Sequence, residues 1–304
     1  MLRGLYTAAS GMISQQRRHD IVTNNIANIN TPGFKQGNAI NRSFPEMLIS
    51  RIGNGKGEPQ AIPVGRLNTG VMAEENVSVH KQGDIQETSS PFDFAIVSNM
   101  QVPGARFDAS GKYVDANGQR INQPQALFTV QDPNGEQRYT LDGKFSVDVN
   151  GRLISTNGLP VLGTDGQPIV LMDTTTQTPI IDFRVTKSGR FLNPDGSEIL
   201  NANNQPVSLL ISRIEDPNQL VREGNGLYRL NPGFEGMARP VNPNDPNEME
   251  QLEVRQGFIE RSNVDGSQSV VDMMAALRAY EANQKVVQFY DKSMDKAVNE
   301  VGRV

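Results

Sequence analysis

The chain has 304 residues, enough for roughly two or three domains, with 37% hydrophobic and 6% aromatic residues, no Trp, 28 Gly and 18 Pro. This composition favours small β-modules joined by many turns over one large α/β core. The net charge of -5 excludes a basic surface for nucleic acid or anionic membrane, no apolar run reaches the ~20 residues of a bilayer span, and the lack of Cys excludes disulfides and thiolate metal sites.

A first helix is predicted from about Leu2 to Ala27 by apolar residues spaced seven apart. Gln15 and His19 interrupt this seam. We expect the helix to end in the segment 28–33, because Asn and Gly tolerate helix-ending conformations and Pro32 disfavours a helical residue before it. The apolar positions are Leu5, Met12 and Ile26 on one side of the seam and Ala8, Val22 and Ile29 on the other.

The segment 36–90 has a mixed pattern. Phe44–Ile52 is compatible with a short helix or a strand, and Gly53–Gly57 is predicted to be a flexible loop. From Pro91 onward the pattern indicates β structure. Phe92, Phe94 and Ile96 alternate with Asp93, Ala95 and Val97, which predicts a half-buried strand.

Four Asn-Gly or Asp-Gly pairs follow one another between Arg138 and Gly166, each flanked by β-forming residues. Such pairs supply the positive φ angles of tight hairpin turns, so this stretch predicts an antiparallel meander. A second β group is predicted within 183–214. The Pro- and Asn-rich segment 231–249 favours an extended path back towards the C-terminal helix.

The C-terminal helix is predicted to begin near Ser262, Asn263 and Asp265, which are natural N-terminal caps. A helix with a single apolar seam must bury that seam, so we expect the two terminal helices to pair with each other or with neighbouring copies. The alternative is that both helices pack on one globular core. The seam consists of Met273, Tyr280, Val287, Met294 and Val301, flanked by Val270, Leu277 and Val298 and interrupted by Gln284 and Asp291.

Candidate chemical sites are weak throughout the chain. The loop 53–57 lacks the Ser or Thr and the preceding strand of a phosphate-binding loop. The segments 115–118 and 132–135 superficially resemble calcium loops, but hairpin turns explain them better. The sequence therefore predicts no catalytic, cofactor-binding or metal-binding residues and no enzyme. Other groups weighed are His19 as an interfacial imidazole, Glu74 with Glu75 or Glu87 with Asp93 as a carboxylate pair, and Met273, Met274 and Met294 as seam residues.

Three segments of the chain carry motifs that occur together in a known family. The first is Asn24–Lys35, which contains Ala27-Asn28-Ile29-Asn30-Thr31-Pro32-Gly33-Phe34-Lys35. The second runs from Gly83 through Phe92–Ile96 and continues at Tyr139–Phe145. The third comprises Ser262–Asp265 and Arg278–Lys285. In this order the three segments closely resemble the bacterial flagellar rod and hook protein family, most of all its distal-rod type, and the resemblance covers nearly the whole chain.

One departure from the family pattern follows Ala95-Ile96, where Ser98-Asn99 replaces a glycine-rich turn. Residues 100–125 then intervene before Leu127–Val130, and we interpret them as an insertion in a hairpin. The fold predicted is mainly β with paired α-helical termini. Its domains are 1–35 with 262–304 (helical, coiled-coil-like), 36–90 with 231–261 (connecting) and 91–230 (outer antiparallel β).

The resemblance implies a structural subunit that polymerises into a rigid tubular shaft, transmits torque to the hook and encloses the export channel. It also implies passage through the flagellar type III export apparatus without a cleaved signal, a place in the basal body, contacts with other rod and hook proteins, and no cofactor. The alternatives are a hook-type subunit, a peptidoglycan hydrolase or a secreted carbohydrate-binding protein. The subunit interface predicted comprises Leu5, Ala8, Met12, Val22, Ile26, Asn28, Asn30, Thr31, Gly33, Phe34, Asn263, Met273, Leu277, Tyr280, Val287, Met294 and Val298.

Overall fold

The computed structural model describes residues 2–52, 61–100, 102, 104–107, 112–115, 117–118, 120–172, 178–201 and 204–301. Contacts divide the chain into two compact units. The helical unit contains residues 1–27, 37–77 and 265–304, and the β unit contains residues 28–36 and 78–264.

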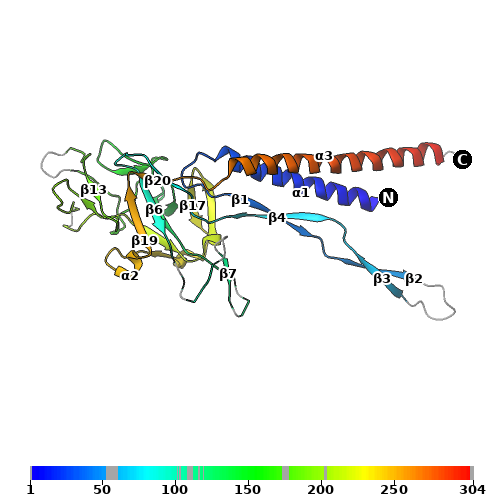
Figure 1. Cartoon of the computed structure of the whole chain (residues 1–304), viewed down its shortest axis with the longest axis horizontal. Helices are drawn as coiled ribbons and strands as arrows, with labels where there is room; N and C mark the ends of the chain where they lie inside the picture. Colours follow the sequence, from blue (N-terminus) through cyan, green and yellow to red (C-terminus); the bar gives the residue numbers. More distant parts are fainter. Residues whose placement is uncertain are drawn as a thin grey trace. The chain divides into compact units, whose positions relative to one another are not determined.

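Two long helices, α1 (Leu2–Ala27) and α3 (Gly266–Lys296), lie side by side and antiparallel in the helical unit (Figure 1). Arg18 on α1 forms an ion pair of 3.2 Å with Asp272 near the start of α3. The predicted range of α1 is confirmed. The side chain of Asp265 accepts a hydrogen bond from the amide of Gln268, so this residue is the N-terminal cap of α3 as expected. No helix in the described part of the chain is both long and apolar enough to cross a bilayer.

A pair of two-stranded ribbons completes the helical unit (Figure 1). Strand β1 (Gly37–Ser43) pairs with β4 (Val71–Ser78), and β2 (Met47–Ile52) pairs antiparallel with β3 (Ala61–Leu67). Ser14 on α1 donates a hydrogen bond of 2.8 Å to Asn41 on β1. The segment that was compatible with helix or strand is therefore a strand from Met47. The loop predicted at 53–57 lies outside the described residues.

The β unit contains a six-stranded antiparallel sheet and several two-stranded ones. In the six-stranded sheet the order is β16 (Leu220–Gly224), β17 (Leu227–Leu230), β10 (Gln137–Thr140), β9 (Gln125–Gln131), β15 (Ile211–Ile214) and β18 (Ala238–Pro240). The described two-stranded pairs are β6 (Phe94–Ser98) with β19 (Leu252–Gln256), β5 (Ile85–Glu87) with β20 (Phe258–Glu260), β7 (Lys112–Val114) with β8 (Arg120–Asn122), β11 (Phe145–Val147) with β12 (Leu153–Ser155), and β13 (Arg184–Val185) with β14 (Phe191–Leu192). The predicted fold class, mainly β with helical termini, is confirmed.

A ring of three main-chain hydrogen bonds organises residues 145–171, which we call repeat 1. The amide of Leu153 donates to the carbonyl of Ile169, the amide of Ile169 to that of Val161, and the amide of Val161 to that of Leu153, each at 2.9 Å. These three residues are spaced eight apart in the sequence and are 0–3% exposed. A hairpin turn ending at Gly151 leads into the ring, and turns ending at Gly158 and Gly166 connect its three sides; each of these glycines has a positive φ.

The same ring recurs 38 positions later in residues 183–209, which we call repeat 2. Phe191 donates to Val207, Val207 to Ile199, and Ile199 to Phe191, at 2.8–3.0 Å. Asn204, with a φ of 61°, occupies the position of Gly166. Asn tolerates this left-handed conformation better than most residues. The two groups of predicted turns are thus one structural motif used twice.

Packed phenylalanines form the centre of the larger core cluster of the β unit. The ring of Phe145 lies 5.2 Å from that of Phe128 and 5.7 Å from that of Phe94, and Phe94 also contacts Phe191 at 6.2 Å. All four side chains are at most 5% exposed. Aromatic pairs at these separations add to the stability given by burial alone, and here they join β6 and β9 to both repeats.

The strand predicted around Phe94 is buried on both faces, so the half-buried interpretation is wrong. Asp93 and Ala95 are 5% and 1% exposed, close to the 0% of Phe94. On its partner strand β19 one face is buried, with Leu252 at 2% and Val254 at 3%. A small residue such as Ala fits either face of a strand, and alternation alone does not reveal that the second face is covered.

The meander is also not continuous. Strand β10 pairs with β9 and β17, and not with β11 as the Asp142-Gly143 turn suggested. The main chain around Gly143 instead pairs with residues 92–94, since the Phe94 amide donates to the Gly143 carbonyl at 2.9 Å. A Cβ atom at Gly143 would overlap the Phe94 carbonyl, so this close approach requires glycine.

Two further segments show local differences from the expectation. The return path 231–249 contains a short helix, α2 (Pro246–Met249), because Asp245 caps it and proline is favourable at a first helical position. The described part of the insertion 100–125 includes the β7–β8 hairpin. The predicted division into three domains, with boundaries at 35, 90, 230 and 262, stays a prediction.

Candidate assembly interface

The face of α3 that packs in the helical unit follows a regular seven-residue pattern. The predicted seam residues Met273, Tyr280, Val287 and Met294 are half-buried, whereas the side chain of Val301 is outside the described set. The second half of the seam consists of Ser269, Ala276, Asn283, Tyr290 and Ala297, all buried or half-buried. These small and polar residues were not identified from the sequence, although their strict spacing of seven was a usable signal.

Glycines on α1 allow this second half of the seam to approach closely. Tyr290 lies against Gly4 and Asn283 lies against Gly11, where a Cβ atom would come within 2.9 Å of the Asn283 side-chain nitrogen. Because the two glycines are seven residues apart, as are their partners, each larger side chain meets a gap in the opposite helix. The seam therefore combines apolar contacts with glycine gaps.

Apolar residues predicted to flank the α3 seam do not lie in it. Val270, Leu277 and Val298 are 43%, 42% and 71% exposed. They share the exposed part of the helical unit with other large apolar side chains. These are Val271, Met274, Val286 and Phe289 on α3, Tyr6 and Ile13 on α1, and Met47, Leu48, Ile49 and Val64 on the β2–β3 ribbon. Contiguous exposed apolar surface is typical of interaction sites, and a role of these residues between subunits stays a prediction.

The predicted residues of α1 contact elements within the chain. Ala8 and Val22 are buried, while Leu5, Met12 and Ile26 are half-buried. The interrupting residues Gln15 and His19 are half-buried as well. Asn25 exchanges hydrogen bonds of 2.8 and 2.9 Å with the main chain of Gly37, which attaches β1 to α1.

The remaining predicted residues form a junction between segments 28–36 and 258–264, both in the β unit. Thr31 donates to the Asn28 side chain at 3.1 Å, and the amide of Gly33 donates to the carbonyl of Glu260 at 2.8 Å. The Asn263 side chain accepts from the amide of Gln36 and donates to the carbonyls of Val79 and Lys81 at 2.7–3.0 Å. These are intrachain contacts, so a role of the junction residues between subunits stays a prediction.

A buried ion pair lies at the centre of the junction. The Lys35 ammonium is 2.6 Å from a Glu260 carboxylate oxygen, and the two side chains are 2% and 4% exposed. The same ammonium donates to the carbonyl of Lys81 at 2.9 Å, and the amide of Gly83 donates to the carboxylate at 2.8 Å. The Arg222 guanidinium lies 4.7 Å from the centroid of the Phe34 ring. A buried pair with this many partners makes the junction specific, since either charge alone would be strongly unfavourable.

Substitution at Gly33 in the junction is restricted both by its backbone conformation and by its neighbours. Its φ is 67°, and a Cβ atom would lie 2.6 Å from the Leu141 carbonyl carbon. We expect Gly33→Ala to lower the free energy of unfolding by about 3 kcal/mol, from left-handed strain and the clash together. Gly158→Ala is the control, because its φ is 75° with open space around it, and should lose only about 1 kcal/mol. If urea titrations showed the same loss of unfolding free energy for Gly33→Ala and Gly158→Ala, the clash with Leu141 would not contribute.

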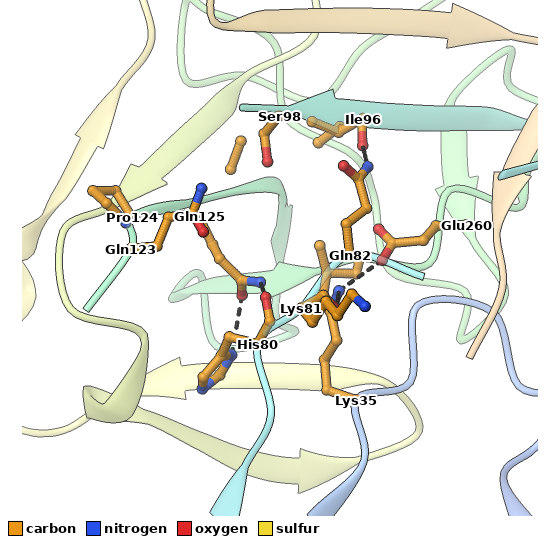
Figure 2. A pocket seen from close by; sticks show the side chains of 12 residues that line it. Lys35, His80, Lys81, Gln82, Ile96, Ser98, Gln123, Pro124, Gln125 and Glu260 are labelled. Carbon is orange, nitrogen blue, oxygen red and sulfur yellow. Dashed lines mark hydrogen bonds and ion pairs between the residues drawn. The ribbon is translucent and has the colours of Figure 1, made fainter. Parts of the chain in front are cut away.

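A small polar cavity of about 120 Å³ adjoins the ion pair (Figure 2). Lys35, Glu260 and Gln82 line one side, and His80 and Gln125 line another. The Nδ1 atom of His80 lies 3.1 Å from the Gln125 side-chain oxygen, and the Gln125 amide donates to the His80 carbonyl at 2.7 Å. In the described residues no group of three or more His, Asp or Glu side chains could hold a metal ion. Lys35 and Glu260 neutralise each other at the cavity wall, which fits a structural role in the junction.

His80 makes the stability of the β unit depend on pH. Burial, followed by the charge of Lys35, lowers the pKa of His80 to about 4 from its ordinary 6.5, with a smaller opposing contribution from Gln125. The unfolded chain therefore binds more protons below pH 6.5, so stability should fall by up to about 3 kcal/mol as the pH drops through about 4. Urea unfolding at about pH 7 and about pH 4.5 should show a smaller difference for His80→Gln than for the wild type. Identical pH dependence in both proteins would contradict this.

Comparisons with known proteins agree with the order of these elements. Residues 5–35 match the model described as flagella basal body rod protein, residues 123–220 the flagellar hook protein FlgE/F/G D1 domain, and residues 255–300 the flagellar basal body rod FlgEFG protein C-terminal. These ranges include most of α1, strands β9, β10 and β15 of the six-stranded sheet, both repeats, and α3.

Similar full-length proteins give the same result. The chain is 38% identical to the flagellar hook-basal body complex protein FlhO of Bacillus subtilis, covering 100% of both proteins. It is 28% identical to the flagellar basal-body rod protein FlgG of Borreliella burgdorferi, over 98% of each. The FlgG protein of Caulobacter vibrioides is 28% identical, over 96% of this chain and 97% of its own length. The chain therefore belongs to the flagellar basal-body rod and hook protein family.

Proposed function

We propose that this protein is a structural subunit of the flagellar basal-body rod, of the distal-rod type. The observation that carries this proposal is similarity over the full length to proteins named flagellar basal-body rod protein. Those names favour a rod subunit over the hook alternative. The family is one of structural proteins, and the only role that this function requires of the chain is assembly.

The surface of the helical unit supports polymerisation. One face of α3 is used within the chain, and the exposed apolar residues Leu277, Phe289 and Val298 lie beyond that seam. Burial of such side chains contributes about 1.5–3 kcal/mol each when it is complete. In a tube each subunit repeats the same contact, so these contributions recur along the shaft and give it the rigidity that torque transmission requires.

The location and partners follow from the proposed role. The rod is placed in the basal body, where this subunit would contact other copies and other rod and hook proteins. It would reach that position through the flagellar type III export apparatus without a cleaved signal. An enclosed export channel, lined by terminal helices, belongs to the same proposal.

Imaging of purified basal bodies tests the proposal directly. A copy of the chain with a label at the exposed Val149, which is 91% exposed in a turn of repeat 1, should mark the rod in negative-stain images. Cells that lack the protein should have incomplete rods and no motility. A label found on the hook, or complete rods without the protein, would overturn the proposal.

A further inference from the structure

An edge that is covered in repeat 1 is open at the equivalent place in repeat 2. In repeat 1, Leu162 donates its amide to the carbonyl of Thr129 on β9 and accepts at its carbonyl from the amide of Leu210, both within 3.0 Å. Leu162 is consequently only 1% exposed. Leu200 is the same residue in repeat 2, 38 positions later, and is 45% exposed. Within the described residues, no hydrogen bond joins its amide or carbonyl to another strand.

The geometry of the hairpin explains why these groups point outwards. Leu200 faces Pro206 across the hairpin, and the bonds that close this pair come from their neighbours: Asn201 donates to Gln205 and Val207 to Ile199, both at 2.8 Å. In an antiparallel pair of this kind the two facing residues do not bond to each other. The amide and carbonyl of Leu200 therefore point away from Pro206, towards the outer edge of the hairpin. In repeat 1 the Pro160 carbonyl accepts a hydrogen bond from the Gln131 amide of β9. Glu198 lies 38 positions later, so its carbonyl is the equivalent acceptor in repeat 2.

A groove of about 370 Å³ lies beside this open edge, between the third hairpins of the two repeats. Its size is that of a site for a few side chains or a small molecule. Val170 and Leu200, both large apolar residues and 43% and 45% exposed, line it together with Met172 and Pro206. Among the described lining residues there is no cation, and their one carboxylate, Asp165, accepts a hydrogen bond of 2.9 Å from Asn201. The groove therefore favours an uncharged apolar occupant.

We propose that the groove and the open edge at 198–200 bind an extended apolar strand from a neighbouring copy of this chain. The occupant is inferred from repeat 1, where an extended apolar strand of this same chain, β9, bonds the Leu162 amide and the Pro160 carbonyl, and Leu210 bonds the Leu162 carbonyl. Strand addition satisfies the free main-chain groups, and the groove receives the side chains of the added strand. The inference rests on the proposed rod function for the identity of the neighbour, and it adds a contact between β units to the contacts of the helices.

Peptide binding tests the edge without any assembly. A synthetic peptide with the β9 sequence Gln125–Gln131 should bind the purified full-length chain saturably in isothermal titration calorimetry. Leu200→Lys should weaken this binding by about tenfold or more, because a charge would enter the apolar groove. Val149→Lys, a substitution outside the groove, should not. Equal binding by wild type and Leu200→Lys, or no binding at all, overturns strand addition at this site.

Two modified peptides separate strand pairing from simple apolar insertion. One peptide is methylated at the main-chain amide of Gln131, which removes the donor that bonds repeat 1. The other is methylated at the main-chain amide of Val130, which lies on the opposite edge of the strand. Only the first modification should abolish binding. If both modified peptides bind like the parent, the groove takes apolar side chains alone and the strand-addition proposal fails.

The identity of the occupant is tested in basal bodies with a photoreactive amino acid in place of Leu200. Irradiation should produce a covalent dimer of this chain, and the same substitution at Val149 should not. Complete rods that give no dimer, or a cross-link to a different protein, overturn the neighbouring-copy assignment and leave the rod function intact. Rods that never contain this chain would instead refute the proposed function, while the peptide experiments would still decide the binding site.

Discussion

Leu277→Asp is expected to leave the isolated subunit folded and to prevent rod completion. Leu277 is 42% exposed and outside the α1–α3 seam, so the free energy of unfolding of the monomer should change by no more than about 0.5 kcal/mol. In the rod, burial of an unpaired carboxylate at this position would be unfavourable by several kcal/mol at every subunit contact. Motility assays and negative-stain images of basal bodies should show non-motile cells with incomplete rods.

Val287→Asp is expected to act at a different stage. Val287 is half-buried in the seam of α3 with α1, so this charge should loosen the helical pair within the subunit itself. Hydrogen exchange in the monomer should become faster in both helices, while protection of the β unit is retained. Rod completion should be lost as well.

Gln288→Asp is the matched control for both variants, since it places the same side chain at an exposed polar position of α3. It should assemble into complete rods. Motile cells with complete rods carrying Leu277→Asp would contradict the assembly interface proposed for α3. A monomer of Leu277→Asp that unfolds as readily as Val287→Asp would show that Leu277 acts within the chain.

Lys35→Met is expected to lower the free energy of unfolding by about 3–5 kcal/mol, because it leaves the buried Glu260 carboxylate without its counter-charge. The double variant Lys35→Met with Glu260→Leu should recover much of this loss, since neither charge then remains buried. Urea titrations of the two single variants and the double variant measure the coupling between the residues.

Arg42→Met provides the comparison at the surface. Arg42 forms an ion pair of 3.0 Å with Glu74, but the two side chains are 70% and 39% exposed. Solvent screens such a pair, so its loss should change the stability by about 0.5 kcal/mol or less. If Lys35→Met and Arg42→Met were equally mild, the junction would not depend on its buried pair.

Local sequence patterns were sufficient for the two long helices and for several of the tight turns. The range of α1, the cap at Asp265 and the turns at Gly151, Gly158 and Gly166 depend on interactions within a few residues, namely capping, heptad spacing and positive φ. The family resemblance also came from contiguous motifs. For the same reason the α3 positions of Met273, Tyr280, Val287 and Met294 were assigned to the correct face.

Contacts between distant segments were decided by tertiary structure alone. The seam positions Asn283 and Tyr290 carry polar groups, and only the approach of α1 at Gly11 and Gly4 makes them part of an interface. Lys35 and Glu260 are 225 residues apart, so no local pattern announces their pairing. The exposure of Leu200 and the burial of Leu162 differ for a similar reason. Their local hairpins are equivalent, and only a strand from elsewhere in the chain, β9, covers one edge and leaves the other open.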